Sequence, residues 1–158
     1  FYLNGLSKIA GLPQMKLGWI IHPPRHRQAL ELIADTYLSV SAPVQYAAVR
    51  WLEKAPEIQR QIIIRCQENE AMVRALLRNS PLTPLAIQGG WTLPIEVPRT
   101  RSEEDVICDL LSNHGVLVQP GYFYDFPREA YLIVSLLTPP DILKEGLRRV
   151  LAMFRFDN

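Results

Sequence analysis

The chain has 158 residues, of which 48% are hydrophobic and 21% charged, and its formal net charge is +1. That composition is typical of a soluble globular protein, and no stretch approaches the roughly 18 uninterrupted apolar residues that a membrane span needs. A charge this close to zero also argues against nucleic acid as the main partner, because a surface that follows phosphates needs a clear basic excess. We therefore expect neither nucleic acid nor a membrane among the partners.

The first segment, residues 1–21, contains two short apolar runs on either side of a glycine-rich stretch, which predicts a strand, a loop and a second strand. Lys8 and Lys16 lie eight residues apart in the loop, among small and apolar residues. A lysine held among apolar groups loses hydration, which disfavours its charged form. The free amine is the nucleophile that forms an imine with an aldehyde. Lys8 is therefore a candidate Schiff-base lysine.

The middle of the chain is predicted to be helical. Pro23 and Pro24 open a helix that carries an apolar period to about residue 38, and residues 39–43 interrupt it. We expect a second helix over residues 44–54 and a third over residues 56–78, with Pro56 at its start and Pro81 after its end. The third is long enough to connect two domains.

From residue 80 onward, short strands alternate with helices. We expect strands at 91–97, 116–118 and 131–137, a loop over 120–128, and a helix from 102 to 113 opened by a capping box. Residues 138–141 are expected to cap a last helix. Its buried stripe is predicted to comprise Ile142, Leu143, Leu147, Val150, Leu151 and Phe154. This order suggests a small α/β sandwich with helices packed against one sheet.

Two cysteines, Cys66 and Cys108, fall in predicted helices. Two such residues make neither a disulfide framework nor a metal site, so we expect reduced, half-buried thiols and a cytoplasmic location. The three histidines show no metal-ligand spacing, so we expect no metal.

Residues 5–18 resemble the cofactor-lysine signature of fold-type I pyridoxal phosphate (PLP) enzymes, the class I/II aminotransferase family. That signature runs small, apolar, Ser or Thr, Lys, and after two free positions small and apolar again, ending in a cation, an apolar residue and glycine. Two positions depart from it: Gln14 replaces a small or Asn-like residue, and Lys16 replaces arginine. The matching residues are Gly5, Leu6, Ser7, Lys8, Gly11, Leu12, Leu17 and Gly18. The resemblance continues, more weakly, to the C-terminus.

The resemblance implies that Lys8 is the catalytic Schiff-base lysine, with Ser7 and Lys16 contacting the phosphate of PLP. The chain begins at Phe1 inside an apolar run, which we interpret as the C-terminal portion of a longer aminotransferase. The implied α/β fold is the end of the PLP-binding large domain (residues 1–40), connecting helices (41–79) and a small C-terminal domain (80–158). Amino acid and 2-oxo acid substrates and a homodimer are implied for the full-length protein, and the isolated chain is expected to be inactive.

One position of the resemblance bears on the substrate. Many aminotransferases carry an arginine two residues before the serine of the strand at 131–135, where it binds the substrate carboxylate, but this chain has Ile133 there. Arg128, in the preceding loop, is the nearest replacement. Two alternatives to transamination stay open: an aminotransferase-like PLP-binding effector region of a transcription regulator, or a fold-type I PLP lyase. An upstream helix-turn-helix module would favour the regulator.

Overall fold

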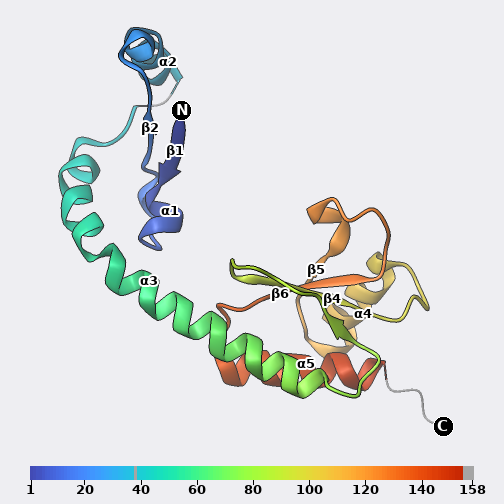
Figure 1. The fold of residues 1–158 in the computed structure, drawn as a ribbon. Helices are drawn as coiled ribbons and strands as arrows, with labels where there is room; N and C mark the ends of the chain where they lie inside the picture. The colour runs from blue at the N-terminus through green and yellow to red at the C-terminus, as the bar shows by residue number, and fades with distance from the viewer. Residues whose placement is uncertain (38, 155–158) are drawn as a thin grey trace. The chain divides into compact units, whose positions relative to one another are not determined.

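The computed structural model describes residues 1–37 and 39–154. Leu38, where the first helix was expected to end, and the last four residues of the expected C-terminal domain lie outside this range. The chain forms two compact units, Phe1–Ile63 and Ile64–Asn158. The boundary falls inside one long helix, α3 (Figure 1). The expected three-part division at residues 40 and 79 remains a prediction.

The first unit begins with an antiparallel hairpin of β1, Tyr2–Gly5, and β2, Gly18–Ile21, in which Gly5 pairs with Gly18. The two strands approach so closely that a side chain at the pair would require the facing backbone to shift. A Cβ on Gly5 would lie 3.0 Å from the Leu17 carbonyl oxygen, and one on Gly18 would lie 3.2 Å from the Asn4 carbonyl oxygen. The predicted strand–loop–strand is therefore present, but residues 6–17 contain helical turns. These are α1, Leu6–Ile9, and a 3₁₀ turn, Pro13–Met15.

The helix predicted after Pro23 is also present, as a 3₁₀ turn, Pro24–His26, that leads into α2, Arg27–Tyr37. Its apolar residues recur with helical spacing, yet none of its side chains is buried. Leu32 is 68% exposed and Tyr37 is 83% exposed. This helix presents its apolar residues to solvent in the described chain.

Helix α3, Ala42–Leu77, replaces the two helices predicted over 44–54 and 56–78. The expected break at Pro56 is wrong. Proline costs a helix one hydrogen bond and favours a kink, but packing on both sides of Pro56 offsets that cost. On its N-terminal side, Ala48 and Ala55 are buried with Leu6 and Ala10 in the core of the first unit. On its C-terminal side, α3 supplies buried residues to the second unit.

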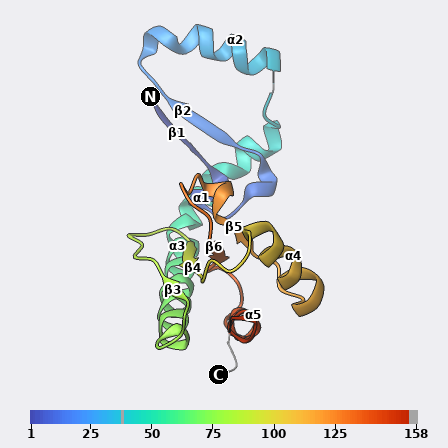
Figure 2. The same cartoon turned by 90° about the vertical axis from the view of Figure 1, so that its right-hand side faces the viewer.

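The second unit contains a four-stranded antiparallel sheet in the order β3–β4–β6–β5. The C-terminal part of α3 and α5 lie along one side of it (Figures 1 and 2). The central strand β6 is buried along almost its whole length, from Tyr131 to Val134. The elements are β3, Thr83–Pro84; β4, Thr92–Glu96; α4, Glu103–His114; β5, Gln119–Pro120; β6, Tyr131–Ser135; and α5, Pro140–Met153. The expected small α/β domain is confirmed.

Several details of this unit differ from the prediction. The strand expected at 116–118 lies instead at Gln119–Pro120, because Gly115 adopts a left-handed conformation and the Val116 N–H donates back to the Leu110 carbonyl, which ends α4. Strand β3 was not predicted. In α5 the buried stripe is as expected except that Ile142 is 59% exposed. The cap expected from residues 138–141 has no side-chain hydrogen bond, and Pro139 occupies the N-cap.

The cap of α4 agrees with the sequence. The Ser102 hydroxyl oxygen accepts from the Asp105 N–H at 3.1 Å and donates to the Asp105 carboxylate at 2.7 Å. Cys66 is buried and Cys108 is exposed, so neither is half-buried as expected, and both are free thiols. Within the described residues, no helix is long and apolar enough to cross a membrane.

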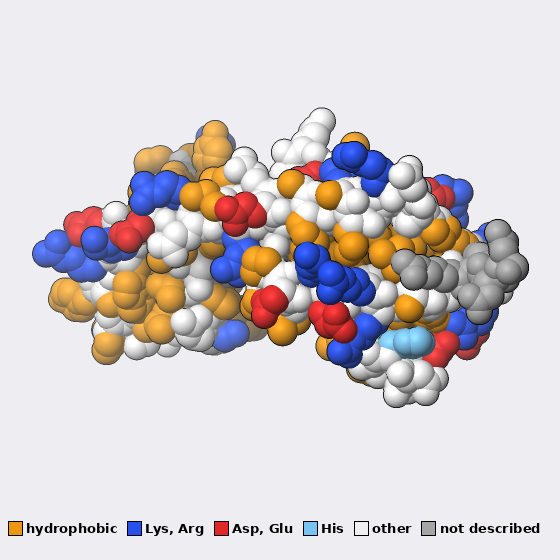
Figure 3. Space-filling view, turned by 90° about the horizontal axis from the view of Figure 1, so that it is seen from below, with side chains coloured by type: hydrophobic (Ala, Val, Ile, Leu, Met, Phe, Trp, Pro, Cys, Tyr) orange, Lys and Arg blue, Asp and Glu red, His pale blue; other side chains and the backbone are white. Residues whose placement is uncertain are grey.

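Charged side chains of both signs are mixed on the face shown in Figure 3. In the described helices, charged side chains also form ion pairs one turn apart, such as Arg50–Glu53 at 3.0 Å and Arg149–Glu145 at 3.0 Å. This face therefore carries no continuous basic stripe of the kind that follows a phosphate backbone.

Candidate functional site

The three residues predicted to bind the cofactor lie together in the first unit. Ser7, Lys8 and Lys16 all line one shallow hollow of about 470 Å³ at the end of the hairpin where the loop 6–17 joins its two strands. The ionisable side chains among the described lining residues are the two lysines, so the hollow is cationic. Its complete lining is Leu3, Asn4, Gly5, Ser7, Lys8, Lys16, Leu17 and Gly18.

Lys8 is placed by the single turn of α1. Leu6 and Ala10, on the buried side of this turn, are 0% and 5% exposed, whereas Lys8 points outward and is exposed. The expectation that apolar neighbours surround Lys8 is therefore wrong for the described chain. Helical periodicity explains the difference, because residues 6 and 10 share a face that residue 8 does not.

Two hydrogen bonds and a left-handed glycine hold the α1 turn. The Gln59 side-chain amide of α3 donates to the Ile9 carbonyl at 2.9 Å, which satisfies an orphan carbonyl at the helix end. Gly11 follows with φ of 64°, a left-handed conformation that suits glycine, and the Leu12 N–H then donates to the Leu6 carbonyl at 3.1 Å. Sequence reasoning missed Gln59, since a glutamine on a long helix carries no signal of its partner.

Lys16 reaches the hollow from the other side of the loop. It ends the 3₁₀ turn in a left-handed conformation, with φ of 52°. This conformation is uncommon for a residue other than glycine, asparagine or aspartate. The Leu6 N–H donates to the Leu17 carbonyl at 3.0 Å, which ties the start of α1 to the residue after Lys16. The two lysines are thereby held on one short closed loop.

The groups around the hollow fit a phosphorylated aldehyde. A hydroxyl and an ammonium group suit a phosphate dianion, and a second amine beside them suits an aldehyde carbon. Among residues 1–37 and 39–154, no cluster of three or more His, Cys, Asp or Glu side chains has an arrangement that would hold a metal ion.

Arg128 belongs to the second unit, where it has two partners. Its Nη2 pairs with Glu96 Oε1 at 2.7 Å, and its Nε donates to the Tyr131 hydroxyl at 2.9 Å. The hydrogen bond to Tyr131 and the charge of Glu96 raise the pKa of Arg128 above its ordinary value, so the guanidinium stays charged. Ile133 is 4% exposed, between Pro94 and Gln119 of the neighbouring strands. Its side chain offers no hydrogen-bonding group.

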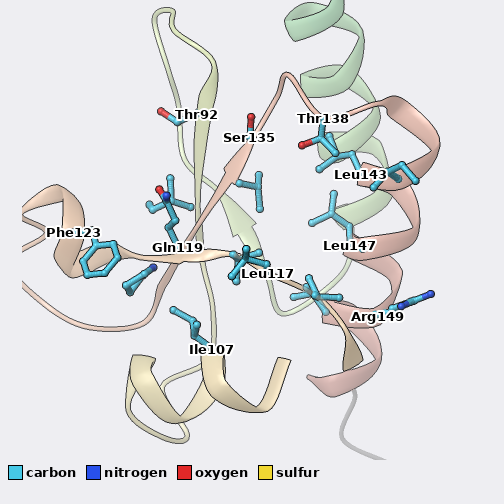
Figure 4. A pocket seen from close by; sticks show the side chains of 18 of the residues that line it. Thr92, Ile107, Leu117, Gln119, Phe123, Ser135, Thr138, Leu143, Leu147 and Arg149 are labelled. Carbon is cyan, nitrogen blue, oxygen red and sulfur yellow. The ribbon is translucent and has the colours of Figure 1, made fainter. Parts of the chain in front are cut away.

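A larger hollow of about 950 Å³ lies within the second unit and was not predicted (Figure 4). Residues of β5, β6, α4, α5 and the turn after β5 line it, and in Figure 4 Leu117, Phe123 and Leu147 point toward it. Leu117 and Phe123 are 77% and 66% exposed. The signal in the sequence was the run of apolar residues from 116 to 124, interpreted as a strand and a loop.

The chain thus combines a lysine on a short turn between two hairpin strands with a long helix and a small antiparallel α/β unit, an arrangement that the comparisons assign to the PLP-dependent aminotransferases. The family model "Aminotransferase class I and II" matches residues 1–150. The chain therefore belongs to this family, whose cofactor is PLP.

The curated relatives that align with most of this chain are aminotransferases. An arginine–pyruvate transaminase of Pseudomonas aeruginosa is 26% identical over 151 residues, which are 94% of this chain and 38% of that protein. An LL-diaminopimelate aminotransferase of Natranaerobius thermophilus is 24% identical, with 96% and 39% covered. The chain thus spans less than two fifths of the length of these relatives.

Solved structures agree on the fold. A PLP-dependent aminotransferase from Streptococcus suis matches with a TM-score of 0.82 at 25% identity, covering 99% of this chain and 42% of that one. An aspartate aminotransferase from Thermotoga maritima matches with a TM-score of 0.79 at 22% identity, covering 96% and 39%.

Proposed function

We propose that the full-length protein is a PLP-dependent aminotransferase that transfers an amino group between an amino acid and a 2-oxo acid. The observation that carries this proposal is the common hollow of Ser7, Lys8 and Lys16, which unites the residues of the cofactor-lysine signature. The family match over residues 1–150 and the transaminase names of the relatives support it over a regulator or a lyase.

Lys8 carries two roles in this proposal. Its amine would hold the cofactor through the aldehyde carbon, with loss of water, and would also serve as the base for the proton on the substrate Cα. The bound cofactor supplies an electron sink for that Cα. The Lys8 side chain is exposed on α1 and lines the same hollow as Ser7 and Lys16.

Ser7 and Lys16 hold the phosphate. The Ser7 hydroxyl would donate to a phosphate oxygen of the cofactor, and Lys16 would neutralise the charge of the phosphate. Lysine acts as a point charge, whereas the arginine usual at this position grips two oxygens at once. We therefore infer that Lys16 binds phosphate with less geometric specificity.

Arg128 is the proposed anchor of the substrate carboxylate within this chain. Its side chain is 61% exposed despite the contacts to Glu96 and Tyr131. Solvent weakens an ion pair as exposed as Arg128–Glu96, so a substrate carboxylate can compete with Glu96.

We further propose a cytoplasmic homodimer. Two free thiols suit a reducing compartment. The apolar residues of the first unit that face solvent suit burial against other protein surface, notably Leu32 and Tyr37 of α2.

The test replaces Lys8 by alanine in the full-length protein, with Lys54→Ala as the matched control on an exposed helical lysine. We expect the visible absorbance of the cofactor Schiff base, and its trapping by borohydride, in the wild type and the control but not in Lys8→Ala. Turnover with a panel of amino donors and 2-oxo acids then separates an aminotransferase from an effector region. Unchanged trapping in Lys8→Ala would refute the assignment.

A further inference from the structure

A carboxylate in the second unit, Glu103, is buried without a cationic partner in any described contact. Glu103 is 3% exposed at the start of α4, next to Ser102, the N-cap. A buried carboxylate is costly unless hydrogen bonds compensate the lost hydration. Its position in the first turn of the helix supplies part of this compensation through the helix dipole.

Two backbone N–H groups, at the two ends of one loop, also compensate the lost hydration of the Glu103 carboxylate. The Tyr131 N–H donates to Glu103 Oε1 at 2.7 Å, and the Tyr122 N–H donates to Glu103 Oε2 at 3.3 Å. One side chain thereby closes the segment 122–131, which contains Arg128. Each oxygen of the carboxylate holds one end of the loop.

The residues around this contact are closely packed. A Cβ on Gly121 would lie 2.8 Å from the Tyr131 Cβ and 3.0 Å from Glu103 Oε1. The Phe126 and Tyr131 rings are in contact, with centroids 4.4 Å apart. The loop is therefore packed directly against the carboxylate and the first residue of β6.

The same loop holds a strained backbone. Asp125 has φ of 55° and Ala130 has φ of 86°, both in the left-handed region that alanine rarely occupies. Such conformations cost free energy and persist where the surrounding contacts over-determine them. Ala130 immediately precedes Tyr131, whose N–H is held by Glu103.

Tyr131 links Glu103 to Arg128. Its N–H is fixed by Glu103, and its hydroxyl accepts from Arg128 Nε at 2.9 Å. The Arg128 guanidinium also lies over the Tyr131 ring, 5.5 Å from its centroid. A shift of Tyr131 would move the guanidinium with it.

We propose that Glu103 is a positioning residue for substrate binding, which closes the loop 122–131 and holds Arg128 in place through Tyr131. This rests on the proposed function, in which Arg128 binds the substrate carboxylate. Glu103 touches neither substrate nor cofactor in this role, so its loss changes substrate affinity and leaves the bond between Lys8 and the cofactor intact.

The experiment uses the full-length protein with Glu103→Gln, and the neighbouring exposed Glu104→Gln as matched control. Glutamine keeps the shape of the side chain, but its NH₂ group faces one of the two N–H donors. We expect KM for the amino donor to rise about tenfold in Glu103→Gln, as suits one lost charge-assisted hydrogen bond, with kcat and the cofactor absorbance unchanged. Hydrogen exchange at the Tyr122 and Tyr131 amides should accelerate in that variant, and Glu104→Gln should match the wild type.

A double-mutant cycle with Arg128→Ala separates positioning from general stability. If Glu103 acts through Arg128, Glu103→Gln changes KM less than about twofold once Arg128 is absent. The proposal would be overturned if Glu103→Gln alone left KM unchanged. It would also be overturned if Glu103→Gln raised KM by the same factor in the wild type and in the Arg128→Ala background. If Glu103→Gln does not fold, Glu103→Asp, which keeps the charge on a shorter side chain, takes its place in the same cycle. If the proposed function is wrong, the wild-type protein itself will show no transamination. If only the role of Glu103 is wrong, the wild type will be active and the variants will not show the expected changes in KM.

Discussion

Asn69 of α3 offers the sharpest test of how the second unit is assembled. Its side chain is 0% exposed, and its Nδ2 donates to the Leu136 and Thr138 carbonyls, each at 2.8 Å. These carbonyls flank the turn between β6 and α5. One amide group of α3 thus holds the end of the central strand and the approach to the last helix.

Replacement of Asn69 by alanine should lower the free energy of unfolding by about 2–4 kcal/mol. The Leu136 carbonyl is left buried without this donor, which costs about 1–3 kcal/mol, and the partly buried Thr138 carbonyl adds about 1 kcal/mol because water reaches it more easily. Asn69→Asp should cost at least as much, since it turns a carboxylate toward both carbonyl oxygens.

The assay is chemical denaturation followed by circular dichroism, with Gln67→Ala as the control at an exposed site on the same helix. The control should lie within about 0.5 kcal/mol of the wild type. A cost below about 1 kcal/mol for Asn69→Ala, at an unchanged denaturant slope, would show that the two hydrogen bonds contribute little and would refute the reasoning.

Three further predictions concern single side chains. Arg128→Ala in the full-length protein should raise KM for the amino donor by the equivalent of about 1.5–3 kcal/mol, measured by steady-state kinetics, with cofactor binding unaffected; unchanged kinetics would remove Arg128 from the site. The Asn113 amide, together with a nearby arginine, lowers the pKa of Asp109 from 3.8. Its ionised form therefore stabilises the fold above that unfolded-state pKa, and this contribution is lost as the pH falls through the lower folded-state value. Asp109→Asn should flatten the acid limb of a stability-against-pH curve, and an unaltered limb would contradict this. Burial raises the pKa of the Cys66 thiol, so iodoacetamide should label Cys108 in the folded protein and Cys66 only after unfolding, as mass spectrometry would show; equal labelling rates would be the contrary result.

Local pattern predicted much of the fold because the elements are amphipathic or carry strong caps. Ser102 and the apolar period after it placed α4 to within a residue or two, and the apolar run at 131–137 placed the central strand. The predicted break at Pro56 was wrong because a proline ends an isolated helix, whereas here tertiary packing on both sides of Pro56 sustains helix α3. The strand at 116–118 was misplaced because the turn at Gly115 delays pairing until Gln119.

The candidate site likewise contains residues that the sequence could predict and residues that it could not. Ser7, Lys8 and Lys16 could be predicted as site residues because they belong to one contiguous signature, and in the structure they line one hollow. Gln59 and Glu103 were missed because their partners lie far along the chain, at Ile9 and Tyr131. In the sequence Glu103 cannot be told from Glu104, and only the direction of the first helical turn buries one and exposes the other.

The close contact of Gly5 with Gly18 also limits how this chain can vary in length. The pair fixes the two ends of the loop 6–17, and any side chain at Gly5 would meet a backbone oxygen at 3.0 Å. An inserted or deleted residue inside the loop would change the separation of Lys8 from Lys16, while one inside the hairpin would shift every pair and turn its side chains to the opposite face. Substitutions at the lining positions other than Gly5 and Gly18 leave this spacing unchanged, whereas an insertion or deletion between Lys8 and Lys16 changes it.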